Sequence, residues 1–303
     1  MDSLSKSGFS IIVCTRNRAS LLSDCLESFI TQTSCPENVE FIVVDNNSSD
    51  TTKEVTLSFR SRFPRLRYIL EETIGLSAAR NRGMHESAYD WVCFMDDDAL
   101  AHKDFIERMF FIKNNFSFDA FGGMFYPWHR TQKPKWLSEE FGKMPLLRKD
   151  IGTLDNTLFV AGGICAFNKE KAMKAGGFPL DIGMRGDIVG YGEENYLQTK
   201  MRENGDTIGF DPDWKIDHLV APYKYTVSWQ LQRHFGKGRD KQISKGKPIS
   251  FLNKCGLMAR ALLSALFSLL KNLPRLFRKN YFLQNYIIDS LSYFYRVWGS
   301  VSV

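Results

Sequence analysis

WVCFMDDDAL, residues 91–100, ends an apolar run with three consecutive carboxylates, Asp96, Asp97 and Asp98. Short apolar runs of this kind predict buried strands of a parallel sheet. Three similar runs precede it, and segments with apolar residues at helical spacing separate them. Strands that alternate with helices at this spacing indicate βαβ units, so we expect an α/β fold with a mostly parallel sheet. The three earlier runs are FSIIVCT (9–15), VEFIVVDNN (39–47) and LRYILEE (66–72).

Beyond residue 100 the alternation becomes less regular. DAFGGMFYP (119–127) and LFVAGGICAF (158–167) are typical of further strands. A helix is expected to begin near Glu193 and to end at Gly205, because glycine is favoured just past a helix end.

The acids follow two of the predicted strands at the points where these strands end. Asp45 ends one run, and Asp96, Asp97 and Asp98 end another. In open α/β sheets ligands bind at the carboxyl ends of the strands, and unpaired carboxylates at close range are costly. Mg²⁺ or Mn²⁺ would remove that cost and would bridge to substrate phosphates, so we expect a nucleotide site. The alternative to a metal site is a solvent-exposed acidic turn that caps a helix beginning at His102.

Arg80 and Arg82 lie one helix upstream of the acids, where a guanidinium group can reach phosphate or a base. The chain has no GxxxxGK[ST] sequence and therefore no P-loop. It also has no GxGxxG after a strand, which argues against a dinucleotide dehydrogenase.

The composition, with 303 residues, 44% hydrophobic and 24% charged, is typical of one α/β domain with an appendage. The six cysteines form no CxxC pair and no zinc-spaced cluster, which favours reduced thiols in a cytoplasmic protein. The sequence MDSLSKSGFS lacks the apolar segment of a signal peptide. No run reaches the length of uncharged apolar residues expected of a spanning helix.

The C-terminal part differs in charge and character. Residues 224–303 hold fourteen Lys and Arg but only two acids. The apolar segments 256–273 and 281–298 suit helices that lie in a membrane interface, with basic residues toward anionic headgroups. The alternative is a helical pair packed on the main domain or across a dimer. We place the boundary between residues 240 and 241, with the helical region at 241–303.

Seven segments, in order, resemble the family-2 glycosyltransferases, a large inverting group with the GT-A fold. The resemblance covers roughly residues 8–240 and implies a Rossmann-like, mostly parallel sheet flanked by helices. Three segments match the family patterns "VVDDgSxD", "flDaDD" and "GEDxDLxxRlrxxG", and the last has Glu in place of Asp. The seven are FSIIVCTRNR, FIVVDNNSSDTT, IGLSAARNRG, WVCFMDDDAL, FVAGGICAFNKEKAMKAGGFP, GYGEENYLQTKMRENG and FDPDWKIDHL.

The resemblance implies an enzyme that transfers a sugar from a nucleotide sugar, most often a UDP-sugar, with Mg²⁺ or Mn²⁺. It gives nucleotide-binding roles to five residues: Thr15, Asn17, Asp45, Arg80 and Asp96. Asp98, Asp96 and His218 would bind metal, and Asp97 could replace either acid. Glu194 matches the catalytic base, with Glu193 as the alternative. Trp128, Trp136 and Phe159 could stack on acceptor sugars or could serve packing alone.

The acceptor that we expect is a saccharide or a polyprenyl-linked saccharide, as in surface polysaccharide or lipopolysaccharide biosynthesis. The protein would then work in the cytoplasm, on the inner face of the cell membrane, without nucleic acid as a partner. Two alternatives remain open. One is a sugar-phosphate nucleotidyltransferase, although CTRNRASL (14–21) lacks the glycines that such an enzyme carries after its first strand. The other is an inactive adaptor that binds membranes or polyanions.

Overall fold

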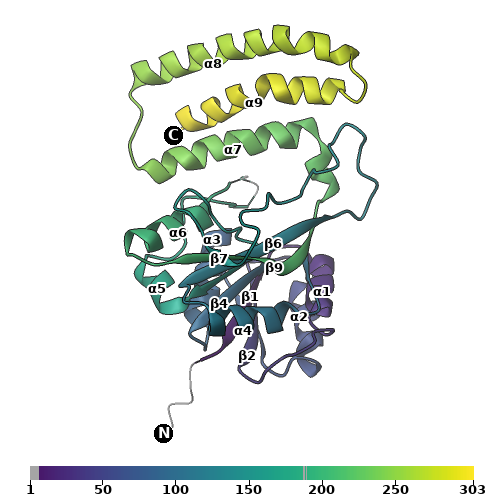
Figure 1. The fold of residues 1–303 in the computed structure, drawn as a ribbon, viewed down its shortest axis with the longest axis vertical. Helices are drawn as coiled ribbons and strands as arrows, with labels where there is room; N and C mark the ends of the chain where they lie inside the picture. Colours follow the sequence, from purple (N-terminus) through teal and green to yellow (C-terminus); the bar gives the residue numbers. More distant parts are fainter. Residues whose placement is uncertain (1–6, 187, 189) are drawn as a thin grey trace. The chain divides into compact units, whose positions relative to one another are not determined.

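The computed structural model describes residues 7–186, 188 and 190–303, and these form two compact units (Figure 1). The first unit contains the chain up to Trp128, Lys143–Leu180 and Glu193–Leu219. The second contains His129–Gly142, Asp181–Gly192 and Val220–Val303.

The first unit begins with the predicted βαβ alternation. Strands β1, β2, β3 and β4 pair in parallel in the order β3-β2-β1-β4. The register sets Thr15 of β1 opposite Asp45 of β2, and Cys14 opposite Asp96 of β4. The carboxyl ends of three strands therefore meet at one edge. The elements are β1 Phe9–Thr15, α1 Ala19–Ser28, β2 Val39–Asp45, α2 Thr52–Ser58, η1 Phe59–Ser61, β3 Leu66–Leu70, α3 Leu76–Glu86 and β4 Trp91–Asp96.

The rest of the sheet is mixed, and among the described residues it brings the total to nine strands. Strand β8 runs antiparallel between β4 and β6, β9 runs parallel to β6, and β5 and β7 pair with β9 in antiparallel fashion. The elements are β5 Ala99–Ala101, α4 Phe105–Asn115, β6 Ala120–Trp128, β7 Gly152–Thr153, β8 Ile164–Asn168, α5 Lys169–Lys174, α6 Glu193–Glu203 and β9 Ile208–Leu219.

Apolar side chains cover both faces of this sheet. Alternate residues of β1 point to opposite sides, so that Phe9 and Val13 pack with α1 and α4, whereas Ile12 packs with α3, α5 and α6. Strands buried on both faces read as continuous apolar runs, as the sequence showed. This α/β architecture confirms the predicted fold class.

The predicted strand 158–167 is correct only in its second half. Strand β8 begins at Ile164, and residues 158–163 form a loop. The predicted helix at Glu193 is confirmed as α6, which ends two residues before Gly205.

The second unit is mainly helical. It holds η2 Pro222–Tyr225, α7 Val227–Lys245, α8 Phe251–Asn272, η3 Leu273–Phe277 and α9 Leu283–Val301. Helix α9 lies between α7 and α8 (Figure 1). Two glycines allow close packing, because a Cβ on Gly238 would meet the carbonyl oxygen of Arg296 and one on Gly299 that of Phe235. The boundary predicted at residue 240 falls inside α7.

Candidate active site

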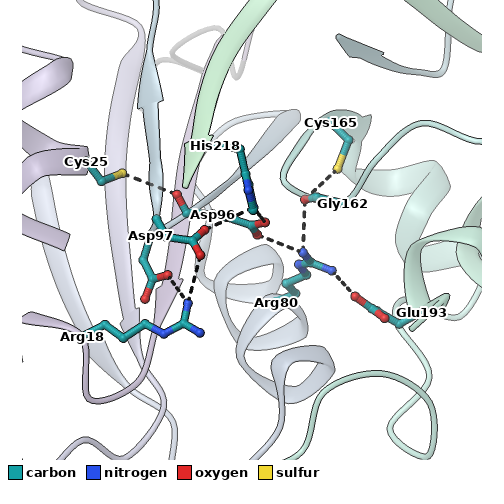
Figure 2. Close-up of polar contacts among 10 residues, drawn as sticks. Arg18, Cys25, Arg80, Asp96, Asp97, Gly162, Cys165, Glu193 and His218 are labelled. Carbon is teal, nitrogen blue, oxygen red and sulfur yellow. Dashed lines mark hydrogen bonds and ion pairs between the residues drawn. The ribbon is translucent and has the colours of Figure 1, made fainter. Parts of the chain in front are cut away.

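Two carboxylates and an imidazole converge at the carboxyl edge of the sheet. Asp96 ends β4, and Asp98 lies in the turn before β5. Strand β5 pairs with β9 so that Ala99 lies opposite His218. His218 Nε2 lies 3.4 Å from Asp96 Oδ2 and 3.3 Å from Asp98 Oδ1 (Figure 2). The three predicted metal-binding residues are thus brought together.

This donor set fits a divalent cation. One ligand atom from each of Asp96, Asp98 and His218 lies within 4.8 Å of the other two. Carboxylate oxygens suit Mg²⁺ and Mn²⁺, and an imidazole nitrogen is a common ligand of transition metals. Asp98 is buried whereas Asp96 is partly exposed, so the group is open on one side.

Asp97 faces a different part of the site. Its buried carboxylate accepts hydrogen bonds from Thr15 Oγ1 at 2.7 Å and from Arg18 Nη1 at 3.0 Å. Arg18 Nη1 also lies 3.5 Å from Asp98 Oδ2. Burial raises the pKa of Asp97 to about 6, because it outweighs the opposing effect of Arg18, and the charge of Asp98 adds to the rise. Asp97 therefore joins the first loop to the acidic turn and lies outside the cluster of Asp96, Asp98 and His218.

Arg18 is a site residue that the sequence interpretation missed. The signal was available, because CTRNR (14–18) puts two arginines directly after a strand whose carboxyl end lies beside the acids. A cation is expected where several carboxylates meet, since leaving them without an opposite charge is costly.

The predicted base-binding residues meet at the ends of β1 and β2. Asp45 is buried, and its carboxylate accepts hydrogen bonds from Tyr68 Oη at 2.7 Å and from the Ser48 amide at 2.9 Å. Asn17 adopts a positive φ of 54°. Its Oδ1 atom accepts from the Ser49 amide at 2.7 Å. The loops after β1 and β2 are therefore tied to each other beside Asp45.

Arg80 is buried on α3 and joins three parts of the chain. Its Nη1 atom lies 2.7 Å from Glu193 Oε1, and its Nη2 atom lies 3.4 Å from Asp96 Oδ1 (Figure 2). Nη2 also donates to the carbonyl oxygen of Gly162 at 3.1 Å. Burial by itself would lower the pKa of Arg80, but the charges of Glu193 and Asp96 raise it above its ordinary value. Arg80 therefore stays charged beside the metal-binding group.

A Gly-Gly pair makes room for these groups. A Cβ on Gly162 would lie 2.9 Å from Arg80 Nη2, and one on Gly163 would lie 2.4 Å from Asp96 Oδ2. Both contacts are closer than real Cβ atoms tolerate. The loop at 158–163 therefore interrupts the predicted strand at a point where Arg80 and Asp96 need space.

Glu193 and Glu194 begin α6 but differ in their surroundings. Glu193 is buried and engaged by Arg80. Glu194 is partly buried, and burial together with the charge of Glu193 raises its pKa to about 8, against the opposing charge of Arg80. A carboxylate with a pKa near neutrality is suited to proton transfer, which makes Glu194 the better candidate for a general base.

The three predicted acceptor aromatics have separate surroundings. Trp128 ends β6 opposite Leu219, and Phe159 stacks under the guanidinium group of Arg202 at 5.0 Å. Trp136 belongs to the second unit, where it packs against a small apolar cluster. Its carbonyl oxygen accepts a hydrogen bond from Asn285 at 2.7 Å. Trp136 thus has packing contacts within the second unit, and its acceptor role stays a prediction.

Comparison of the sequence with protein-family models identifies the family of this chain. The family model described as Glycosyl transferase family 2 matches residues 10–176, more than half of the chain. The chain belongs to this family and is a glycosyltransferase.

Two curated relatives support this assignment. Glycosyltransferase GlyA of Streptococcus pneumoniae is 35% identical over 126 residues, which are 38% of this chain but only 18% of GlyA. Glucosyl-dolichyl phosphate glucuronosyltransferase of Haloferax volcanii is 25% identical over 240 residues, covering 77% of this chain and 76% of the relative.

Solved glycosyltransferases share the fold. Mannosyltransferase PcManGT from Pyrobaculum calidifontis, in complex with GDP-Man and Mn²⁺, aligns with a TM-score of 0.64 at 19% identity, covering 95% of this chain and 87% of that chain. TarS of S. aureus in complex with UDP-GlcNAc aligns with a TM-score of 0.58 at 15% identity, covering 75% of this chain and 65% of the TarS chain. The GT-A fold inferred from the motifs is confirmed.

Proposed function

We propose that this glycosyltransferase moves a sugar from a nucleotide sugar to an acceptor hydroxyl, with inversion and with a divalent metal. The observation that carries the proposal is the convergence of Asp96, Asp98 and His218 beside Arg80. Such a group can hold a cation against a diphosphate, and the PcManGT structure contains both GDP-Man and Mn²⁺.

On the donor side, each residue has a proposed task. The loops at Thr15, Asn17 and Asp45 would hold the base and ribose, with a UDP-sugar as the expected donor. Support comes from the common sheet edge and from the UDP-GlcNAc bound to TarS. Asp96, Asp98 and His218 would hold Mg²⁺ or Mn²⁺, which supplies positive charge to the leaving diphosphate. Arg80 adds a fixed charge on the same side.

On the acceptor side, we assign the general base to Glu194. It accepts the proton of the acceptor hydroxyl as that oxygen attacks the anomeric carbon from the face opposite the diphosphate. Glu193 positions Arg80 through their 2.7 Å ion pair. A single displacement needs one base and forms no glycosyl-enzyme, so the anomeric configuration inverts.

The proposed acceptor is a saccharide, carried on a polyprenyl lipid or free, in the synthesis of a surface polysaccharide or lipopolysaccharide. One support is the relative named for transfer to glucosyl-dolichyl phosphate. The other is the apolar, basic C-terminal region, which suits the proposed location on the inner face of the cell membrane. Trp128 and Phe159 are proposed to contact the acceptor sugar.

The test is donor turnover with a panel of UDP-, GDP- and dTDP-sugars, with Mn²⁺, Mg²⁺ or EDTA. The wild type should release nucleotide from one donor only with metal, and Asp98→Ala should lose this activity. Asp150→Ala removes an exposed acid outside the site and serves as the matched control. Metal-independent turnover, or full activity in Asp98→Ala, would contradict the metal site.

Two other outcomes would change the assignment. Absence of nucleotide binding in a folded protein would favour the inactive adaptor. Formation of a nucleotide sugar from a sugar phosphate would favour the nucleotidyltransferase, against which family membership argues.

A further inference from the structure

Helix α8 carries bulky apolar side chains on its solvent-exposed face. Leu263 and Phe267 are each 67% exposed, and Leu270 is 74% exposed. Leu252 and Leu266 extend this face along the same helix. An amphipathic helix of a water-soluble protein normally turns such residues toward the core. The outer face of α8 therefore needs an apolar environment that the described part of the chain does not provide.

The inner face of α8 is small and polar. Ala261 and Ala265 are buried, and the Asn272 side chain donates to Ser290 Oγ of α9 at 3.2 Å. Tyr286 of α9 donates to the carbonyl oxygen of Leu269 at 3.2 Å. Small residues and interhelical hydrogen bonds are how helices pack in lipid, where apolar burial between helices gains little. Both faces of α8 are thus arranged as in a lipid-exposed helix.

Positive charge accompanies the apolar face. Arg260 and Lys271 are eleven residues apart, about three helical turns, so they lie along one border of this face. Among residues 224–303 the two acids are already paired, Asp240 with Arg239 at 2.6 Å and Asp289 with Arg275 at 2.8 Å. Arg260 and Lys271 are both exposed, so their charges can meet anionic headgroups.

We propose that α8 lies in the plane of an anionic bilayer, with its apolar face at the acyl boundary and Arg260 and Lys271 among the headgroups. The inference deepens the membrane location in the proposed function by naming the contact, but it does not depend on sugar transfer. A second copy of the chain would satisfy the apolar residues, but its own α8 contains no acid that could pair with Arg260 and Lys271.

The helix lies in the interface and does not cross the membrane. The segment Phe251–Phe277 is long and apolar enough to span, and α8 itself measures about 33 Å over its 22 residues. However, α8 packs against α9 and hydrogen-bonds to it at residues 268–272, and α9 packs on α7, whose sequence VSWQLQRHFGKGRDKQISK is polar and charged. Crossing would separate α8 from α9 or pull α7 into hydrocarbon.

Flotation of the full chain with lipid vesicles tests the proposal. Vesicles of phosphatidylcholine with phosphatidylglycerol should carry the protein, and added salt or omission of phosphatidylglycerol should weaken binding. The variant Leu263→Ser/Phe267→Ser/Leu270→Ser should bind at least about tenfold less. The matched control changes exposed apolar residues of the first unit, Phe111→Ser/Leu146→Ser/Leu180→Ser, and should float as the wild type does.

Four results would overturn the proposal. The first is no flotation of the folded wild type, and the second is flotation of the α8 variant equal to that of the wild type. The third is retention of the protein on vesicles after an alkaline carbonate wash, and the fourth is a wild-type dimer that binds no lipid and that the α8 variant converts to a monomer. The third would mean that α8 spans, and the fourth that a second copy covers it. Nucleotide binding by the same variant is measured in parallel. Normal nucleotide binding with lost flotation separates this inference from the proposed function.

Discussion

Glu193 and Glu194 show how neighbouring side chains of one type receive different chemistry. Glu193 has a fixed cationic partner in Arg80, whereas Glu194 lies in a partly buried position beside the charge of Glu193. The sequence pattern matched Glu194 to the base but left Glu193 as the alternative, because the two form an acidic pair at the start of a helix. The ion pair in the structure is what favours Glu194 as the base.

The pH dependence of sugar transfer follows from this difference. Glu194 must be deprotonated to act, so kcat/KM should rise with pH to a midpoint well above the ordinary glutamate value of 4.5 and toward 8. Glu193→Gln removes a charge that raises this pKa, so the rise should move to lower pH. Glu194→Gln should lower kcat by about 10²–10⁴-fold. Activity retained in Glu194→Gln but lost in Glu193→Gln would reverse the assignment.

Stability should change with pH in the opposite sense. A raised pKa means that the folded protein binds this proton more tightly than the unfolded chain, so stability falls as pH rises from 4.5 through about 8. Glu194→Gln should therefore have a higher Tm than the wild type above pH 8, with the difference shrinking toward pH 4.5. Thermal unfolding at several pH values provides this measurement without any substrate.

The three consecutive acids divide between two tasks that the sequence alone did not separate. Asp96 and Asp98 turn to His218, and Asp97 turns to Thr15 and Arg18. The sequence placed the three acids at one edge, because strand ends in a parallel sheet are predictable. Which side chain faces which neighbour depends on the turn before β5 and on its pairing with β9, and no local pattern records that pairing.

At the level of elements, the loop at 158–163 is as important to the site as the strands. Gly163→Ala should displace the Asp96 carboxylate and weaken Mn²⁺ binding by about 10–100-fold, the range seen for residues that support ligands. Titration calorimetry with Mn²⁺ measures this loss. Gly256→Ala, where a Cβ meets no atom within 4 Å, is the control. Wild-type affinity in a folded Gly163→Ala protein would show that the close contact is relieved at no cost.

The sequence predicted a strand here because LFVAGGICAF is apolar throughout. Apolar runs predict burial well, but they do not distinguish a strand from a buried loop. The Val160 N–H and carbonyl are both bonded to the Gln198 side chain instead of to a neighbouring strand, and Gly162 and Gly163 leave space for Arg80 and Asp96. These tertiary contacts outweigh the local strand preference.

For the whole molecule, the candidate catalytic site and the excess positive charge lie in different units. The candidate nucleotide-binding, metal-binding and catalytic residues belong to the first unit, whereas the excess of basic residues lies in the second. The sequence detected this asymmetry through composition. It did not indicate that 129–142 and 181–192 join the second unit, because that grouping rests on contacts between distant segments.

A change in the second unit should therefore leave donor binding intact. Gly238→Ala would place a Cβ 1.8 Å from the Arg296 carbonyl oxygen and force α7 and α9 apart. We expect a loss of about 1–3 kcal/mol, as for overpacking in a core, seen as a lower Tm. Nucleotide affinity should match that of the wild type. A fall in nucleotide affinity together with the fall in Tm would contradict the view that the second unit does not contribute to donor binding.

The bonds from Thr15 to Asp97, and from Arg18 to both Asp97 and Asp98, have a consequence for ligand binding as a whole. The loop proposed for the nucleotide and the turn proposed for the cation cannot rearrange independently, since they share these partners. Occupancy of one is thereby coupled energetically to occupancy of the other. By thermodynamic reciprocity, if the bound cation raises the affinity for the nucleotide by some factor, the bound nucleotide raises the affinity for the cation by the same factor.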